Sequence, residues 1–244
     1  MKKKIIILIF VGHYLPGNKS GGILRSVENM VDQLAEDFEF LIVTRSSDVG
    51  SDSQYPNIKV SAWQTLGKAM IYYLDKPSIT IAEVAELINS VRYDYLFVNS
   101  FFDKLSIKVM CANKLRLLPK KPVILSPRGE FAWASFRLNV IKKCVYVFFS
   151  RLINLYSHVR WHVSSEHELQ DLVNVMSVAK IDIQVAMDLP KPALNFEFVD
   201  DEKYFSDEQL RVVFLSRISE EKNLDIAIKI LSQIRSNVVF DIFG

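Results

Sequence analysis

Two cations near the end of the chain have the types and spacing of a phosphate-binding site. Arg217 follows a β-branched and aromatic run, 212–215, that predicts a buried strand, and Lys222 immediately precedes a helical pattern of apolar residues. A helix N-terminus carries partial positive charge and unpaired N–H groups, so a lysine there is unfavourable unless an anion joins it. Phosphate is the common anion at such a position. The alternative is that Glu220 and Glu221 satisfy the helix dipole and both cations are solvated.

A second candidate lies in the loop after the first predicted strand, 5–11. The loop, 13–22, ends in Gly21 and Gly22 just before a new helical pattern. A strand–loop–helix–strand order implies a βαβ crossover, which places this loop at the carboxyl edge of the sheet, where open α/β folds bind ligands. The glycine pair permits close backbone approach ahead of a helix N-terminus, although a plain turn is the alternative. No GxGxxG follows the strand, which disfavours a Rossmann oxidoreductase or epimerase.

A third candidate is the loop 126–130, SPRGE, at the end of the predicted strand 122–125. Its proline fixes one backbone dihedral, Gly129 frees another, and Arg128 and Glu130 place opposite charges at the same edge of the sheet. Taken alone, such a segment is usually a simple turn.

The segment 214–228, FLSRISEEKNLDIAI, resembles the donor-phosphate loop of the GT-B glycosyltransferases of family 4, in their bacterial polysaccharide-biosynthesis branch. The segments SPRGEF (126–131) and WHVSSEHELQDL (161–172) are similar to segments of the same branch, so the resemblance extends over most of the chain. The family usually has glycine where this chain has Ser216, and often where it has Asn223.

The resemblance implies a role for each candidate. Arg217 and Lys222 would hold the diphosphate of a nucleotide sugar, and the Gly21-Gly22 turn would lie near the donor phosphates. The residues on the acceptor or sugar side would be Arg128, Gly129 and Glu130. No catalytic residue is assigned, because a single histidine within a strand, His162, is more often a packed core residue than a general base.

The implied activity is transfer of a sugar from a nucleotide-diphosphate donor to a carbohydrate or lipid-linked acceptor in cell-surface polysaccharide synthesis. The resemblance implies retention of anomeric configuration, hexosyl transfer, a cytoplasmic site of action and independence from metal ions. The sequence contains no Asp-x-Asp pair to hold a divalent cation, and no cofactor is expected. The alternative is a catalytically inactive module that binds the acceptor or acts as a scaffold.

The predicted fold class is α/β, with a Rossmann-like parallel sheet and helices on both faces over 1–190. A linker rich in Asp, Pro and Glu, 191–209, leads to the first βαβ unit of a second Rossmann-like domain, 210–244. In the resembling family that second domain continues and carries two Glu residues eight apart, which this chain lacks. We therefore expect either a piece of a longer protein or a truncated product.

Composition adds few constraints. The 244 residues are 50% hydrophobic and 24% charged with a net charge of +2, which is ordinary for a globular protein and too small to argue for nucleic acid as a partner. Cys111 and Cys144 are far apart and have no metal-ligand spacing, which favours free thiols in a reducing compartment. The apolar N-terminus runs into a loop without a small-residue cleavage site, which favours a first strand over a signal peptide.

Local patterns predict further elements. Thr80 with Glu83, and Ser165 with Glu168, have the spacing of capping boxes that begin helices. The segment 58–63 is predicted as a short strand. One long basic and aromatic helix is predicted over 136–156, a composition typical of helices that lie on anionic membranes and equally of buried helices with solvated cations.

Overall fold

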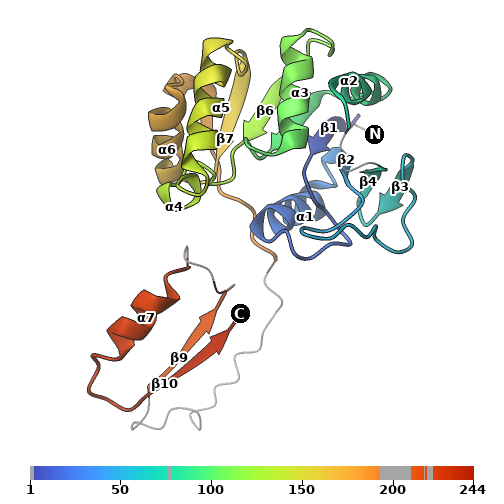
Figure 1. Ribbon diagram of the computed structural model, residues 1–244. Coiled ribbons are helices and arrows are strands. Elements are labelled where there is room, and N and C mark those ends of the chain that lie inside the picture. Colours follow the sequence, from blue (N-terminus) through green and yellow to red (C-terminus); the bar gives the residue numbers. More distant parts are fainter. Residues whose placement is uncertain (1–2, 76–78, 193–209, 217, 219–221) are drawn as a thin grey trace. The chain divides into compact units, whose positions relative to one another are not determined.

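The computed structural model describes residues 3–75, 79–192, 210–216, 218 and 222–244. The chain forms two compact units, 1–191 and 192–244 (Figure 1). Most of the predicted linker, 193–209, lies outside the described residues.

The first unit alternates strands and helices along its length. Its elements are β1 (Ile5–Phe10), α1 (Gly22–Leu34), β2 (Phe38–Arg45), β3 (Trp63–Leu66), β4 (Ala69–Leu74), α2 (Ile81–Asn89), β5 (Tyr95–Asn99), α3 (Lys104–Lys114), β6 (Val123–Ser126), α4 (Trp133–Phe136), α5 (Val140–Leu152), β7 (Val159–Val163), α6 (Glu166–Met176), the 3₁₀ turn η1 (Lys180–Asp182) and β8 (Ile183–Val185).

The strands form one sheet in the order β3-β4-β2-β1-β5-β6-β7-β8. Every neighbouring pair is parallel except β3 with β4, which is antiparallel. The predicted Rossmann-like α/β class is therefore confirmed. From β1 the chain adds β2 on one side and later β5 on the other, so the strand order reverses between β1 and β5. Open α/β sheets bind their ligands at such a switch point, outside the carboxyl ends of the strands.

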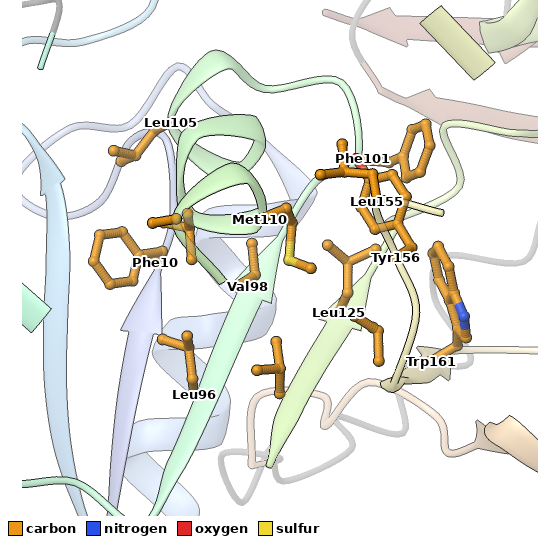
Figure 2. Packing of buried hydrophobic residues seen from close by; sticks show 14 of the residues in the cluster. Phe10, Leu96, Val98, Phe101, Leu105, Met110, Leu125, Leu155, Tyr156 and Trp161 are labelled. Atoms are coloured by element: carbon orange, nitrogen blue, oxygen red, sulfur yellow. The ribbon is translucent and has the colours of Figure 1, made fainter. Parts of the chain in front are cut away.

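Helices cover both faces of this sheet because its strands are apolar on both sides. In β1, Leu8 and Phe10 belong to the cluster packed under α2, α3, α5 and α6, whereas Ile9 joins a second cluster with Leu24 and Val27 of α1. Figure 2 shows the first cluster, where Phe10 and Leu96 of neighbouring strands lie beside the helices. A slip of one residue would exchange the side chains of the two clusters, so the register depends on the fit of each side chain in its own cluster.

Aromatic side chains close the first cluster at the carboxyl edge. The ring of Phe101, directly after β5, stacks on Tyr156 at 4.6 Å and lies 4.8 Å from Phe131 and 6.1 Å from Trp161 (Figure 2). The loops after β5 and β6 are therefore held in place by packing of these aromatic side chains.

Two predicted elements are wrong in detail. The helix predicted over 136–156 is divided into α4 and α5, because Asn139 adopts a left-handed backbone conformation with φ of 61° that a continuous helix does not allow. The segment 58–63 is not a strand: it contains an isolated bridge from Val60 to Tyr73, and only Trp63 belongs to a strand, β3. The antiparallel hairpin β3–β4 lies after it and turns at Gly67, with φ of 59°. The capping box at Thr80 and Glu83 is confirmed, with both of its reciprocal hydrogen bonds present.

The second unit contains β9 (Leu210–Leu215), α7 (Leu224–Leu231) and β10 (Val238–Phe243). The two strands pair in parallel from Leu210 with Val238 to Leu215 with Phe243, as the predicted βαβ unit requires. Many apolar side chains of this unit are exposed, among them Val213, Leu215, Ile226, Ile230 and Phe243.

Candidate functional site

The switch point between β1 and β5 is lined by polar groups. Asn99 is the last residue of β5 and is fully buried, and its Nδ2 donates to the carbonyl oxygen of Phe10, the last residue of β1, at 3.3 Å. Its Oδ1 points to the next loop along the sheet. Asn99 thus joins the ends of β1 and β5, the two neighbouring strands between which the strand order reverses.

Arg128 lies in that next loop and contacts three different elements. Its Nε and Nη2 donate to Oδ1 of Asn99 at 2.9 and 2.7 Å, and its Nη1 donates to Oγ of Ser26 in α1 at 2.7 Å. Nη1 also forms an ion pair with the carboxylate of Asp188, beyond β8. The Arg128 side chain is only 6% exposed. Ser26, Asn99, Arg128 and Asp188 form what we call the switch-point cluster.

Glu130 holds the loop after β5. Its Oε1 accepts from Oγ of Ser100 at 2.6 Å, and its Oε2 accepts from the backbone N–H groups of Phe101 and Phe102 at 2.5 and 3.0 Å. Burial raises the pKa of the Glu130 carboxyl, although these three donors oppose the shift. Both oxygens are thus occupied within the fold, which makes Glu130 a residue that positions its neighbours.

Glu168 holds the opposite side of the same loop. Its Oε1 accepts from the backbone N–H of Gly129 at 2.6 Å, and its Oε2 accepts from N and Oγ of Ser164 at 2.7 and 2.9 Å. The capping box predicted here is half right, because Ser165 does accept from the Glu168 N–H at 3.2 Å, but the Glu168 carboxylate turns to Gly129 and Ser164. Glu130 and Glu168 together join the loops after β5, β6 and β7.

His162, near the end of β7, lies beside this cluster as a neutral ring. Its Nε2 is 3.0 Å from the carbonyl oxygen of Ala186, and its Nδ1 is 3.2 Å from Oγ of Ser126. A carbonyl only accepts, so Nε2 carries the proton and Nδ1 accepts from the serine hydroxyl. Burial, and then the charge of Arg128, lower the pKa of His162, which favours the neutral form of the ring.

The residues after β8 form a strap across α1. Nδ2 of Asn29 donates to the carbonyl oxygen of Leu189 at 2.9 Å, and Nε2 of Gln33 donates to that of Pro190 at 2.7 Å. With Asp188 on Arg128, the strap, residues 186–190, is bound at several points to the elements around the switch point.

A concave space of about 530 Å³ lies beneath the strap, between α1 and the sheet. Its walls are mostly apolar, and Arg128, His162 and Asp188 contribute polar groups. Small-molecule sites have this composition, with apolar walls and a few convergent polar groups.

The glycine pair lies at the start of α1. Gly21 is the N-cap residue and has φ of 68°, which disfavours any residue with a side chain, and no side chain caps the helix. A Cβ built on Gly22 would meet nothing within 4 Å. The first turn of α1 contains no acidic residue, and the Oγ of Ser20 is buried without a hydrogen-bond partner in the part of the chain that the structure describes. These features leave space and unpaired donors for an anion.

Other contacts fix the rest of that loop. The N–H groups of Asn18 and Lys19 donate to Oδ2 of Asp48, in the loop after β2, at 2.9 and 3.2 Å. Gly12 lies against the ion pair of Arg45 and Asp103, so a Cβ there would come within 2.6 Å of Nη1 of Arg45. The loop is thus pinned before it reaches the glycine pair.

The predicted cations belong to the second unit. Arg217 lies outside the described residues. Lys222 is exposed just before the N-cap of α7, Asn223, which has φ of 52° and makes no side-chain capping bond. The first turn of α7 contains Asp225, so this helix start already has one carboxylate.

The residues predicted on the acceptor or sugar side, Arg128, Gly129 and Glu130, lie in the loop after β6 beside the switch point, and their role there stays a prediction. The sequence did not predict the contacts that these residues make with Ser26, Asn99, Asp188 and Glu168. For Asn99 the sequence did contain one indication of a functional role, because it is a polar residue at the end of an otherwise apolar strand. Among the described residues, no group of three or more His, Cys, Asp or Glu side chains is arranged to hold a metal ion.

No protein-family model and no curated protein sequence matches the chain. Among solved structures, the chain is similar to a sucrose-phosphate synthase from Thermosynechococcus elongatus, with a TM-score of 0.62 and 13% identity over 97% of this chain and 62% of that one. It also matches an α/β-galactoside α-2,3-sialyltransferase from Photobacterium phosphoreum, with a TM-score of 0.41 and 12% identity over 98% of this chain and 75% of that one. The chain thus spans 62% of the length of the sucrose-phosphate synthase and shares its fold, a Rossmann-like fold found in glycosyltransferases.

Proposed function

We propose that the protein is a retaining glycosyltransferase of the GT-B type. It moves a hexose from a nucleotide-diphosphate sugar to a carbohydrate or lipid-linked acceptor in the synthesis of a cell-surface polysaccharide, at the cytoplasmic side of the membrane. Three independent features support this: the fold shared with the sucrose-phosphate synthase, the family-4 pattern of residues 214–228, and the arrangement of the carboxyl-edge loops.

The observation that carries the proposal is the open glycine turn at the switch point. At the end of the loop after β1, Gly21 and Gly22 form a helix start without a side-chain cap or a first-turn acid, and a Cβ built on Gly22 would meet nothing within 4 Å. A sugar nucleotide brings a diphosphate that needs such N–H donors and space for close approach.

The chemical difficulty of the reaction is the charge that develops on the leaving diphosphate. Fixed cations and N–H groups stabilise that charge without reorganisation, and most strongly where water is excluded. We assign this role to Arg217 and Lys222, with the α1 helix start contributing to donor binding.

Arg128 is the proposed residue on the acceptor or sugar side, with Gly129 and Glu130 shaping its loop. Its guanidinium faces the space beneath the strap together with Asp188 and His162. In this proposal Asp188, whose side chain is 40% exposed, is the partner that a sugar hydroxyl would most readily replace.

Isothermal titration calorimetry with UDP and GDP tests the proposal. A charge-assisted hydrogen bond contributes about 1.5–3 kcal/mol, so Arg217→Ala and Lys222→Ala should each weaken nucleotide binding roughly ten- to a hundredfold. Arg235→Ala, which removes an exposed cation elsewhere in the second unit, is the matched control and should bind normally. NMR of the product formed from the bound donor then gives the anomeric configuration.

Unchanged nucleotide affinity in both variants would remove Arg217 and Lys222 from the site. If the protein binds oligosaccharide acceptors but neither nucleotide, the non-catalytic module is the better description.

A further inference from the structure

The outward side of α5 carries an apolar stripe without a covering element in the described part of the chain. The stripe consists of side chains that are between 50% and 77% exposed and recur at helical spacing: Ile141, Val145, Phe148, Phe149 and Leu152. The side of α5 that packs on the protein carries Val147 and Ser150, which are buried. With 3.6 residues per turn, Val147 and Ser150 lie opposite the stripe. One side of α5 is therefore buried against the protein, and the other side is apolar but exposed.

The apolar surface continues beyond both ends of α5. Trp133, in α4, is 73% exposed, and Leu138 and Ile153 are each more than half exposed. Exposed apolar and aromatic side chains gathered in one stretch of the chain, 133–153, are typical of an interaction surface.

Charge indicates the chemistry of the partner. From Phe131 to Ser165 the sequence has no Asp or Glu, whereas it has five cations: Arg137, Lys142, Lys143, Arg151 and Arg160. On the helical wheel Lys142 lies on one side of the stripe and Arg151 on the other, and both are exposed. Apolar residues with long cations on both flanks suit a surface that is apolar inside and anionic at its rim.

Lys143 does not belong to this surface. Its Nζ donates to the carbonyl oxygen of Ser135 at 2.6 Å and lies 4.9 Å from the ring centre of Phe102. This contact secures α5 to the loop after β5, so the stripe is presented by a helix that is fixed in place.

We propose that α5, with Trp133, docks the protein on the surface of an anionic lipid bilayer. Among the described residues no helix is long and apolar enough to cross a membrane, and a helix of 13 residues measures only about 20 Å, so α5 lies in the plane of the interface. A second copy of this chain is a poorer occupant, because it would bring two basic faces together, whereas anionic headgroups neutralise them.

Docking also has a consequence that rests on the proposed function. The loop of Arg128 leads through α4 directly into α5. A membrane-bound α5 therefore holds the carboxyl-edge loops near the headgroups, where the sugar-accepting end of a lipid-linked acceptor lies.

Vesicle co-sedimentation with the 244-residue chain tests the proposal. The chain should sediment with vesicles of equal parts phosphatidylcholine and phosphatidylglycerol, should bind vesicles of phosphatidylcholine alone at least about tenfold more weakly, and should be released by salt. Phe148→Ser with Phe149→Ser should weaken binding to the anionic vesicles by about tenfold or more, because two inserted aromatic side chains are lost.

Matched variants separate charge from apolar contact. Lys142→Gln with Arg151→Gln should weaken binding and reduce its salt dependence, whereas Lys120→Gln with Lys121→Gln, which removes two exposed cations elsewhere, should not. Ile181→Ser changes a still more exposed apolar residue outside the stripe and should leave binding unchanged. All these positions are exposed, so equal thermal stability shows that each variant is folded.

Tryptophan fluorescence gives a second readout. Trp133 should shift to shorter wavelength on anionic vesicles. Trp133→Phe should abolish the shift, while the half-buried Trp63 and the buried Trp161 remain. The proposal is overturned if the wild-type chain does not bind anionic vesicles at low salt. It is equally overturned if the phenylalanine double variant binds as well as wild type, or if light scattering shows that the stripe mediates dimers instead. Nucleotide binding is measured separately, so failure here leaves the proposed glycosyl transfer intact.

Discussion

Arg128 donates through both Nε and Nη2 to a single oxygen, Oδ1 of Asn99, at 2.9 and 2.7 Å. Because Asn99 also donates to Phe10, this contact links the SPRG loop to the point where the strand order reverses. It has a measurable energetic consequence.

Arg128→Ala should lower the free energy of unfolding by about 1–3 kcal/mol, because Oδ1 of buried Asn99 loses its donors. Urea denaturation measures the change, and Arg160→Ala, which removes an exposed cation from β7, should cost less than about 0.5 kcal/mol. A double-mutant cycle with Asn99→Ala should give a coupling of about 1 kcal/mol. Strict additivity of the two substitutions would show that the contact contributes nothing.

Glu130→Ala should be more damaging, by about 3 kcal/mol or more, because the N–H groups of Phe101 and Phe102 and the hydroxyl of Ser100 lose their acceptor. Glu130→Gln retains an acceptor and removes a buried charge, so it should cost clearly less. Thermal unfolding of both variants gives the comparison, with the exposed Glu166→Ala as control. Equal losses in the alanine and glutamine variants would contradict a positioning role through these donors.

The two neighbouring glycines should respond in opposite ways. Gly21→Ala should lower stability by about 1–2 kcal/mol, since φ is 68° there, whereas Gly22→Ala should raise it by about 0.5–1 kcal/mol. If a diphosphate approaches this turn, Gly22→Ala should nevertheless weaken UDP or GDP binding in calorimetry. A more stable Gly22→Ala protein with unchanged nucleotide affinity would place the donor elsewhere.

His162 should make the protein sensitive to mild acid. Its folded pKa lies below its ordinary value of about 6.5, so below that pH the unfolded chain gains a proton that the folded chain resists. The free energy of unfolding should therefore decrease as the pH falls below about 6.5. His162→Gln should flatten this dependence in urea titrations across the same range. An identical pH profile in the variant would assign the acid sensitivity to another group.

The sequence predicted much of this fold because buried parallel strands are continuous apolar runs and helices repeat at 3.6 residues. It failed at Asn139, where one left-handed residue divides a pattern that is apolar and basic throughout. It also missed β4, an apolar run that follows β3 after the short turn at Gly67.

Contacts between loops that are distant in the sequence could not be predicted for a different reason. Glu168 has the spacing of a capping box, and nothing local shows that its carboxylate prefers Gly129, 39 positions away. Likewise Arg128 meets Ser26 across 102 positions and Asp188 across 60. The side-chain partners depend on which strands become neighbours, which is a property of the whole sheet.

The strap 186–190 determines where the chain leaves its first unit. Its carbonyl groups are bound by Asn29 and Gln33, and its carboxylate is bound by Arg128. A ligand that draws Arg128 away from Asp188 therefore releases one anchor of the departing chain. Occupancy near the sheet edge is in this way coupled to how firmly the strap is held against α1.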